Sequence, residues 1–249
     1  MMTPAPDRNA TAPRPPGRLS RALIRMLMKQ ARVAGTEALA ENFRLLTLES
    51  PAFKQLPWLP GQKIQITMGS AFVARTFTPI EWDQAAGRTR ILGYMHGHGP
   101  GSSWLRDASP GDECHVFGPR ASLDLSQADG MCIMLGDETS IGLAYALHRQ
   151  VSGIPLQTLF EVSDRASALA VLARLDLDGV ELFERRENDA HLTQIEHRLP
   201  ALAATQASFI LTGRAAFIQR LRSALKSLGV PGSRLKAKAY WAAGKTGLD

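Results

Sequence analysis

Cysteine is scarce in this chain, and its scarcity excludes several classes of site. Only two cysteines occur, Cys114 and Cys132, each within a run of apolar residues. No Cys-x-x-Cys pair or Cys/His cluster is present, which excludes iron–sulfur clusters and structural zinc. A disulfide framework is excluded as well, and this favours a reducing compartment. We expect both thiols to be inert core residues.

The chain also lacks long apolar segments and runs of basic residues. The apolar stretch at residues 22–28 contains Arg25, so it is too short and too interrupted for a signal peptide core or a membrane span. The net charge of +6 is dispersed, and no basic run alternates with aromatic residues, which excludes nucleic acid as a partner. A membrane surface or an anionic small ligand would suit such a charge. We expect a cytoplasmic, monomeric protein.

The first half of the chain has the pattern of a β-domain. Residues 1–17 are rich in Pro, Ala and Arg, and we expect them to be a disordered tail. Within residues 18–127, strands are predicted at 43–48, 63–68, 74–78, 88–95 and 113–117, with one helix before the last. Five or six short strands separated by turn signals predict a small antiparallel β-barrel.

The second half, residues 128–249, changes to alternating strands and helices. The run 131–135 is continuously apolar, as expected of a strand buried on both faces. Further strands are predicted at 156–162, 180–184, 208–211 and 234–241, and helices at 140–150, 167–175, 191–198 and 215–228. This alternation predicts a Rossmann-like parallel α/β domain with helices on both faces of the sheet.

The most informative segment is Arg75-Thr76-Phe77-Thr78-Pro79, at the end of a predicted strand. A flavin nucleotide needs a cation for its pyrophosphate, a flat ring for its isoalloxazine and a small donor near N5. Strand periodicity puts Arg75 and Phe77 on one face, and Pro79 ends the strand with Thr78 at a corner. Taken alone, the segment is also compatible with an ordinary strand.

A second segment, residues 96–102, is rich in glycine and precedes a predicted helix at 102–107. Ser102 is the predicted N-cap, and the helix start would direct free N–H groups at a phosphate. His96 and His98 alternate with glycine, but no Cys, Asp or Glu is near enough to complete a metal site, so none is predicted. The alternative is a plain surface loop.

Three segments of the second half are candidates for ligand contacts. Residues 136–140 follow the first parallel strand, where open α/β sheets bind ligands, although they would also cap a helix. After the second strand, Ser163 and Arg165 favour NADPH, whereas Asp164 favours NADH or simply caps a helix. On the last strand, a period of two residues puts Arg234, Lys236, Lys238 and Tyr240 on one face, and a bound anion would relieve the repulsion among its positive charges. A solvated edge strand protected by lysines is the alternative.

With these segments the chain resembles the siderophore-interacting protein family, the flavin-dependent ferric-siderophore reductases, whose fold is ferredoxin-reductase-like. The resemblance covers residues 33–244 and rests on segments 75–79, 96–104, 118–120, 136–139 and 240–241. It implies FAD on the barrel, with Phe77 stacked on the flavin, Thr78 near N5 and Trp241 over a flavin edge. Thr78 and Thr139 are the catalytic candidates. The cofactor residues that it implies are Arg75, Thr76, Phe77, Thr78, His96, His98, Gly99, Gly101, Ser102, Ser103, Asp137, Glu138, Thr139 and Trp241.

The family resemblance also implies a reaction. NADPH or NADH would donate a hydride to the flavin, which would then pass single electrons to the iron of a ferric siderophore. Such an acceptor is anionic, and we expect a basic mouth formed by Lys63, Arg120, Lys236 and Lys238 to attract it. Two alternatives remain open: an FAD reductase of the same fold that serves ferredoxin, flavodoxin or a quinone, and a flavin-bearing siderophore carrier without turnover.

Overall fold

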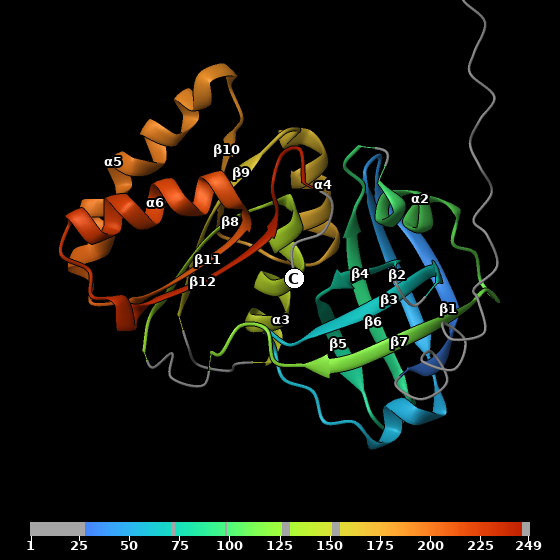
Figure 1. The fold of residues 1–249 in the computed structure, drawn as a ribbon. Helices are drawn as coiled ribbons and strands as arrows, with labels where there is room; N and C mark the ends of the chain where they lie inside the picture. Colours follow the sequence, from blue (N-terminus) through green and yellow to red (C-terminus); the bar gives the residue numbers. More distant parts are fainter. Residues whose placement is uncertain (1–27, 71–72, 98, 126–129, 151–154, 246–249) are drawn as a thin grey trace, which may run out of the picture.

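The computed structural model describes residues 28–70, 73–97, 99–125, 130–150 and 155–245. They form an antiparallel β-domain followed by a parallel α/β domain (Figure 1). The predicted tail at 1–17 and the predicted domain boundary at 127/128 lie outside the described residues. Within these ranges, no helix is both long and apolar enough to cross a membrane.

The β-domain is a seven-stranded antiparallel sheet with the strand order β4-β3-β7-β1-β2-β6-β5. Its elements are β1 (Lys29–Ala40), β2 (Phe43–Glu49), the short 3-10 helix η1 (Pro51–Gln55), β3 (Lys63–Ser70), β4 (Val73–Phe77), β5 (Pro79–Asp83), β6 (Arg88–Tyr94), the helix α2 (Pro100–Asp107) and β7 (Glu113–Arg120). The outermost strands β4 and β5 are separated in sequence by Thr78 alone. The sheet must therefore curl until its two edges meet, which confirms the predicted barrel.

Two strands of this barrel, β1 and β5, were missing from the strands predicted by periodicity. β1 contains register shifts between Val33 and Gly35 and between Ala38 and Ala40, and such bulges interrupt the two-residue alternation. β5 begins at Pro79, the residue predicted to end the preceding strand. Proline is tolerated as the first residue of a strand, so here it ends one strand and starts the next.

The α/β domain is a five-stranded sheet with the order β10-β9-β8-β11-β12, and every pairing is parallel, as predicted. Its strands are β8 (Cys132–Asp137), β9 (Leu156–Val162), β10 (Val180–Glu184), β11 (Ser208–Arg214) and β12 (Leu235–Trp241). Its helices are α3 (Ile141–Gln150), α4 (Arg165–Arg174), α5 (Ala190–Ala204) and α6 (Ala215–Ser227), with 3-10 turns η2 (Glu138–Ser140), η3 (Glu187–Asp189) and η4 (Gly232–Arg234).

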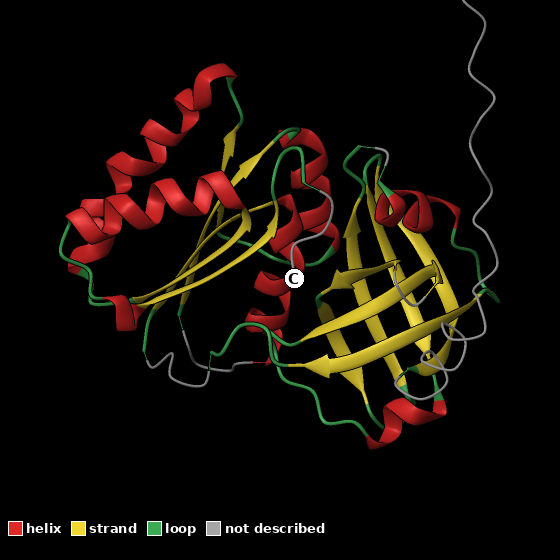
Figure 2. Ribbon diagram, in the orientation of Figure 1, coloured by secondary structure: helices red, strands yellow, loops and turns green. Residues whose placement is uncertain are grey.

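Helices cover both faces of the parallel sheet (Figure 2). Ile133 and Leu135 of β8 pack against α5 and α6 on the outer face, whereas Met134 packs on the face of α3 and α4. All six residues of β8 are buried, as its continuous apolar run predicted. The face with α3 and α4 is turned toward the β-domain.

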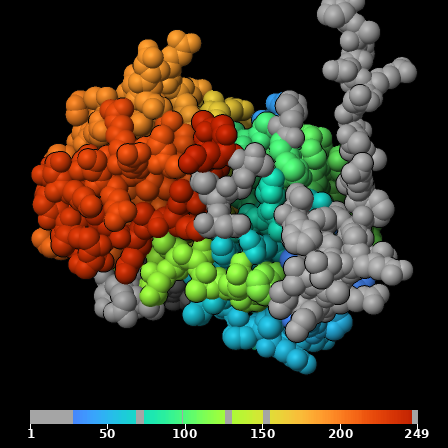
Figure 3. Space-filling model, viewed as in Figure 1, coloured from blue at the N-terminus to red at the C-terminus, as the bar shows by residue number. Residues whose placement is uncertain are grey.

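The two domains share one apolar cluster, so they pack directly on each other (Figure 3). Phe43 and Ile80 of the barrel belong to the same cluster as Ile141 of α3 and Phe160 of β9. At this interface a Cβ atom placed on Gly142 would lie 2.8 Å from Cγ2 of Ile80, closer than carbon atoms pack. Glycine at this position lets α3 approach β5, and this approach brings the edge of the parallel sheet up to the barrel seam.

Candidate functional site

The barrel seam positions the first group of candidate residues. In β4, Arg75 pairs with Ile66 and Phe77 with Ile64, so both side chains lie on one face, as the strand period requires. The Phe77 ring lies 5.7 Å from the Trp104 ring of α2, and Nη1 of Arg75 donates to the Ala74 carbonyl oxygen at 2.7 Å. Thr78, the single residue between β4 and β5, stands at the seam itself.

The glycine-rich turn leads into α2, but the helix begins earlier than predicted. Pro100 is the first helical residue and Gly99 is the N-cap, so the predicted N-cap at Ser102 is wrong. The reason is that the φ of proline is preorganised for the first helical position. The Ser102 hydroxyl instead donates to the His96 carbonyl oxygen at 2.9 Å and closes the turn. His98 lies outside the described residues.

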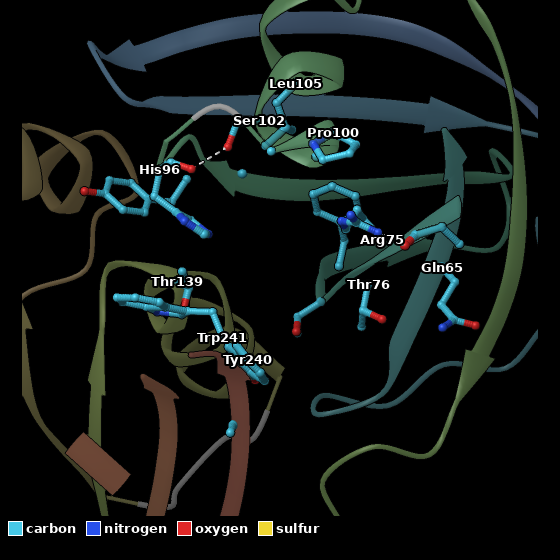
Figure 4. A pocket seen from close by; sticks show the side chains of 18 of the residues that line it. Gln65, Arg75, Thr76, His96, Pro100, Ser102, Leu105, Thr139, Tyr240 and Trp241 are labelled. Carbon is cyan, nitrogen blue, oxygen red and sulfur yellow. Dashed lines mark hydrogen bonds between the residues drawn. The ribbon is translucent and has the colours of Figure 1, made fainter. Parts of the chain in front are cut away.

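A cavity of about 930 Å³ lies between the two domains. It is lined by the barrel seam at Thr78, by the glycine-rich turn that precedes α2 and by the end of β12. Figure 4 shows His96, Trp241 and Arg75 around its open centre. The predicted residues that line it are Arg75, Thr76, Phe77, Thr78, His96, Gly99, Gly101, Ser102, Thr139, Lys238 and Trp241. Residues from opposite ends of the sequence thus meet at one site.

The rings of Trp241 and His96 form an aromatic wall of the cavity, and Asp137 holds this wall in place. The indole Nε1 of Trp241 donates to Oδ2 of Asp137 at 2.8 Å, and the His96 ring packs 5.3 Å from the Trp241 ring. Asp137 is fully buried and also accepts hydrogen bonds from the backbone N–H groups of Thr139 and Arg214. Burial raises the pKa of Asp137 to about 6, against the hydrogen bonds from Thr139 and Trp241 that lower it. Burial also lowers the pKa of His96.

Behind this wall lies a buried network of ionic groups that the sequence analysis missed. Arg185, after β10, pairs with Glu138 at 2.6 Å and with Glu161 of β9 at 3.4 Å, and its guanidinium lies 5.7 Å from the Trp241 ring. Arg214 binds both carboxylate oxygens of Glu161, at 2.7 and 2.8 Å. Burial would raise the pKa of Glu161, but hydrogen bonds from Arg214 and His191 outweigh it and lower the pKa. The sequence signal that could have predicted this network is Glu161, a charged residue inside the otherwise apolar end of β9.

Glu138 therefore does not line the cavity. It is buried and also accepts a hydrogen bond from the backbone N–H of Ser163. The Ser163 hydroxyl accepts from Nη1 of Arg185 at 2.6 Å, and Asp164 caps α4, as the alternative interpretation held. Nη1 of Arg165 donates to the Leu182 carbonyl oxygen at 2.5 Å. Each of these polar groups thus has a partner in the α/β domain, and the Ser163 hydroxyl also lies 3.5 Å from the Tyr94 hydroxyl of the barrel.

The remaining predicted residues lie at or behind the rim. Ser103 lies in α2 beside Ser102 but does not line the cavity. Lys63 pairs with Arg120 across β3 and β7, and Nη2 of Arg120 donates to Oε1 of Gln65, a lining residue, at 2.5 Å. Lys236 lies on β12 outside the lining.

On β12, the predicted alternation of faces holds from Leu235 to Ala239 and ends at Tyr240, the extra residue of a bulge. Leu235 and Ala237 pack toward α6, so Lys236 and Lys238 face the side of the barrel. Arg234 does not join them, because it precedes β12 and its Nε donates to the Ala207 carbonyl oxygen at 2.8 Å.

Several lining residues were not singled out from the sequence. They include Gln65, Tyr94 and Phe117. Tyr94 and Phe117 are ordinary strand residues by sequence, and only the curl of the barrel brings them to the cavity. Tyr240 had been placed on the lysine face of the last strand, without a role.

The residues present fit a flavin nucleotide. The cavity volume of about 930 Å³ lies within the range of about 300–1,000 Å³ typical of small-molecule sites. A Cβ atom built on Gly97 or Gly99 would meet no atom within 4 Å, so both glycines leave open space where a phosphate can approach the backbone. Arg75 supplies a cation beside this turn, and the Cβ that Gly101 lacks would lie 3.2 Å from its Cγ. Phe77, with the aromatic wall, supplies flat surface for a ring.

Comparison with known proteins agrees with this site. Residues 17–123 match the family model of the siderophore-interacting FAD-binding domain, and residues 130–244 match that of the siderophore-interacting protein. The first match confirms the expectation of FAD. Among solved structures, the siderophore-interacting protein SipS from Aeromonas hydrophila has a TM-score of 0.71 at 21% identity, over 88% of this chain and 93% of that one. This last likeness is one of fold.

Two curated proteins are similar in sequence. The mycobactin import ATP-binding/permease protein IrtA of Mycobacterium tuberculosis is 30% identical over 181 residues, which are 69% of this chain and 20% of that protein. The NADPH-dependent ferric-chelate reductase of Escherichia coli is 27% identical over 177 residues, 68% of this chain and 66% of that protein. The chain therefore spans less than two thirds of the length of either relative.

Proposed function

This chain belongs to the siderophore-interacting protein family, and we propose that it is an oxidoreductase that transfers electrons from NAD(P)H through FAD to a ferric siderophore and releases Fe(II). The observation that carries the proposal is the cavity between the domains, which joins the barrel seam, the glycine turn and the end of β12. The nucleotide donor is a cytoplasmic metabolite, so we place the reaction in the cytoplasm.

The barrel would hold the cofactor by charge and by ring contacts. Arg75 and the N–H groups of the turn at Gly97 and Gly99 would bind the pyrophosphate, and Phe77 would contact the ring system. Bound FAD supplies hydride acceptance from a nicotinamide and one-electron transfer to iron. No protein acid or nucleophile is needed for this chemistry, so the chain contributes position, electrostatics and exclusion of water.

The approach of the acceptor is favoured by cations at the cavity. Lys238 and Lys245 line it, and Arg120 lies directly behind Gln65 of the lining. A ferric tris-catecholate carries several negative charges, and such cations raise the encounter rate of an anionic substrate. We assign the larger effect to Lys238 and Lys245, and a smaller one to Lys63 and Lys236, which lie outside the lining.

For the nucleotide, NADPH remains the proposed donor. The Arg165 guanidinium is held by the Leu182 carbonyl oxygen, so it can contribute to a 2′-phosphate site only by moving. Arg186, after β10, is an exposed arginine at the same carboxyl edge of the sheet. We therefore propose Arg186 together with Arg165 as cations for the 2′-phosphate. A tenfold preference for NADH in kcat/KM would contradict this donor.

The decisive experiment is steady-state turnover of the FAD-loaded protein. Oxidation of NADPH and of NADH is followed with a ferric tris-catecholate siderophore, while a ferrous chelator reports Fe(II). We expect oxidation to require the ferric siderophore and Fe(II) to appear at two per nucleotide, because a hydride carries two electrons. Faster oxidation with ferredoxin, flavodoxin or a quinone than with the siderophore would contradict the assignment of the acceptor. Tight siderophore binding without oxidation would identify a carrier instead.

A further inference from the structure

Two side chains from opposite edges of the parallel sheet meet beside the cavity. The strand order β10-β9-β8-β11-β12 puts β10 and β12 at the two edges. Arg185 directly follows β10, and Trp241 is the last residue of β12. The Arg185 guanidinium nevertheless lies 5.7 Å from the centre of the Trp241 ring, and both side chains reach Asp137, the last residue of the middle strand β8. They therefore meet along the carboxyl edge of the sheet.

The course of Arg185 along this edge is fixed from its backbone outward. Its N–H donates to the Val162 carbonyl oxygen at 2.7 Å, which extends the pairing of β10 with β9 by one residue. Its Nε then lies 3.4 Å from Oε1 of Glu161, and its Nη2 donates to Oε2 of Glu138 at 2.6 Å. The side chain thus crosses the end of β9 and reaches η2 after β8.

The guanidinium is held by groups on different elements. Besides the bond to Glu138 in η2, Nη1 donates to the Ser163 hydroxyl after β9 at 2.6 Å. A planar guanidinium bound at two nitrogens keeps one orientation. Burial would lower the pKa of Arg185, but the charges of Glu138 and Glu161 outweigh it and raise the pKa. Arg185 is therefore a fixed cation.

The Trp241 ring has two supports of different kinds. Its Nε1 donates to Oδ2 of Asp137 at 2.8 Å, which fixes one atom of the indole but leaves the ring free to tilt about that bond. The Arg185 guanidinium lies over the ring and is attracted by its face. Trp241 lines the cavity, where Figure 4 shows it beside His96, whereas Arg185 does not line it. Arg185 can thus act at the cavity only through Trp241.

We propose that Arg185 is a positioning residue that sets the tilt of the Trp241 ring at the cavity, with Glu138 and Ser163 as its anchors. For its effect on turnover the inference rests on the proposed function, which places the flavin beside this ring. The anchors follow β8 and β9, at the carboxyl edge where open α/β sheets bind ligands. The edge that would receive the nucleotide and the wall that would contact the flavin therefore share one arginine.

Arg214 provides a matched control for the loss of a buried charge. Its side chain is 15% exposed, against 20% for Arg185, and both arginines pair with the buried Glu161. The Arg214 guanidinium, however, binds Glu161 and Asp189. Loss of either arginine leaves the Glu161 carboxylate with one cation fewer, which destabilises the fold. Only loss of Arg185 removes the support of the Trp241 ring.

The first test measures the ring itself, on the full chain before FAD is added. The fluorescence of Trp241 is taken as each protein minus the same protein with Trp241→Phe. We expect Arg185→Met to shift this emission to longer wavelength and to increase its quenching by acrylamide, because a loosened indole becomes more accessible to water. Arg214→Met should lower the free energy of unfolding but leave the Trp241 emission at its wild-type position. Arg185→Lys, which keeps the charge, should recover part of the wild-type emission.

The second test measures turnover of the FAD-loaded protein. We expect Arg185→Met to lower kcat about three- to tenfold, with KM for the ferric siderophore unchanged, because a misoriented ring displaces reacting groups without altering the acceptor site. The double variant Arg185→Met/Trp241→Phe should be no slower than Trp241→Phe alone, since Arg185 acts through this ring.

Two results would overturn the inference. One is a Trp241 emission in Arg185→Met that equals that of the wild type, and the other is the same emission change in Arg185→Met and Arg214→Met. Should Arg185→Met fail to fold, Glu138→Gln weakens the anchor and must shift the Trp241 emission in the same direction. A wild-type protein that does not oxidise NADPH with a ferric siderophore would contradict the proposed function, while the fluorescence test still decides the role of Arg185.

Discussion

At the scale of single residues, the buried carboxyl of Asp137 is the most unusual group of the site. It accepts hydrogen bonds from Trp241 and from two backbone N–H groups, and it lies 3.9 Å from Arg185. Its pKa is raised from 3.8 to about 6, with burial as the main cause. The native state therefore binds a proton more tightly than the unfolded chain, and this group lowers stability as pH rises from 3.8 to about 6.

This shift predicts a titration of the aromatic wall. As pH falls through about 6, the Asp137 carboxylate gains a proton and loses hydrogen-bond acceptor capacity. The hydrogen bond from the Trp241 indole to Asp137 then weakens. We expect the fluorescence contribution of Trp241, taken as wild type minus Trp241→Phe, to titrate near that pH. The titration should vanish in Asp137→Asn and persist in His96→Gln, which removes the other titratable neighbour of the indole. The opposite pattern would assign the change to His96.

The turn glycine Gly99 predicts a loss of cofactor binding without a loss of fold. Its φ is −68°, which any residue adopts, and a side chain there would project into open space of the cavity. We expect Gly99→Val to weaken FAD binding about tenfold or more, because the added methyl groups occupy the space for the phosphate. Fluorescence titration with FAD measures this. Gly232→Val is the control, since that glycine is equally open and lies outside the cavity. Equal FAD affinities of the two variants would contradict a phosphate site at the turn that contains Gly99.

At the scale of elements, the edge strand β12 combines a cationic face with the aromatic wall. Lys236 and Lys238 lie on the barrel side, but only Lys238 lines the cavity. We expect Lys238→Ala to raise KM for a ferric siderophore about two- to fivefold, and Lys236→Ala to raise it less. Flavin content should be unchanged in both variants. The effect should shrink with added salt, because attraction is screened beyond about 8–10 Å at moderate ionic strength. Equal KM values for both variants and wild type would show that these lysines do not attract the acceptor and only keep the edge strand solvated.

The packing of α3 on β5 predicts a cost in stability at Gly142. Alanine favours a helix over glycine by up to about 1 kcal/mol, whereas the added methyl would collide with the buried Ile80 side chain. Overpacking of about 1–3 kcal/mol outweighs propensity, so Gly142→Ala should lower the free energy of unfolding. Urea denaturation measures the difference. Gly35→Ala, at an open position of β1, should change stability by no more than about 0.5 kcal/mol.

At the scale of the whole molecule, the cavity is built by both domains, so one ligand should stabilise both. At an FAD concentration of about 100 times its Kd, binding adds about 2.7 kcal/mol to the native state. For a chain of this size we expect a rise in Tm of about 5–11 °C in a single calorimetric transition. Calorimetry with and without FAD measures it. A shift confined to one of two separate transitions would show that the cofactor contacts one domain only.

The sequence by itself determined the fold class and the expectation of FAD, and it singled out two of the segments that line the cavity. A two-residue period with turn signals predicted the barrel, and a continuous apolar run alternating with helices predicted the parallel sheet, since these patterns depend only on neighbouring residues. The segments at Arg75 and at Gly99 were recognised for the same reason. The helix start at Pro100, in place of Ser102, and the strand begun by Pro79 were local features that were misread.

Only the tertiary structure decided how distant residues meet. The Trp241 indole is hydrogen-bonded to Asp137 across 104 residues, and a bulge at Tyr240 interrupts the alternation that the sequence of β12 predicts. The burial of Glu138 beneath Arg185 also depends on which strands are adjacent in the sheet. Periodicity describes the faces of one element, whereas the site arises where the barrel seam and the carboxyl edge of the parallel sheet are packed together. That packing depends on the close fit of Gly142 against Ile80. Whether two surfaces fit can be judged only when both are folded and in contact.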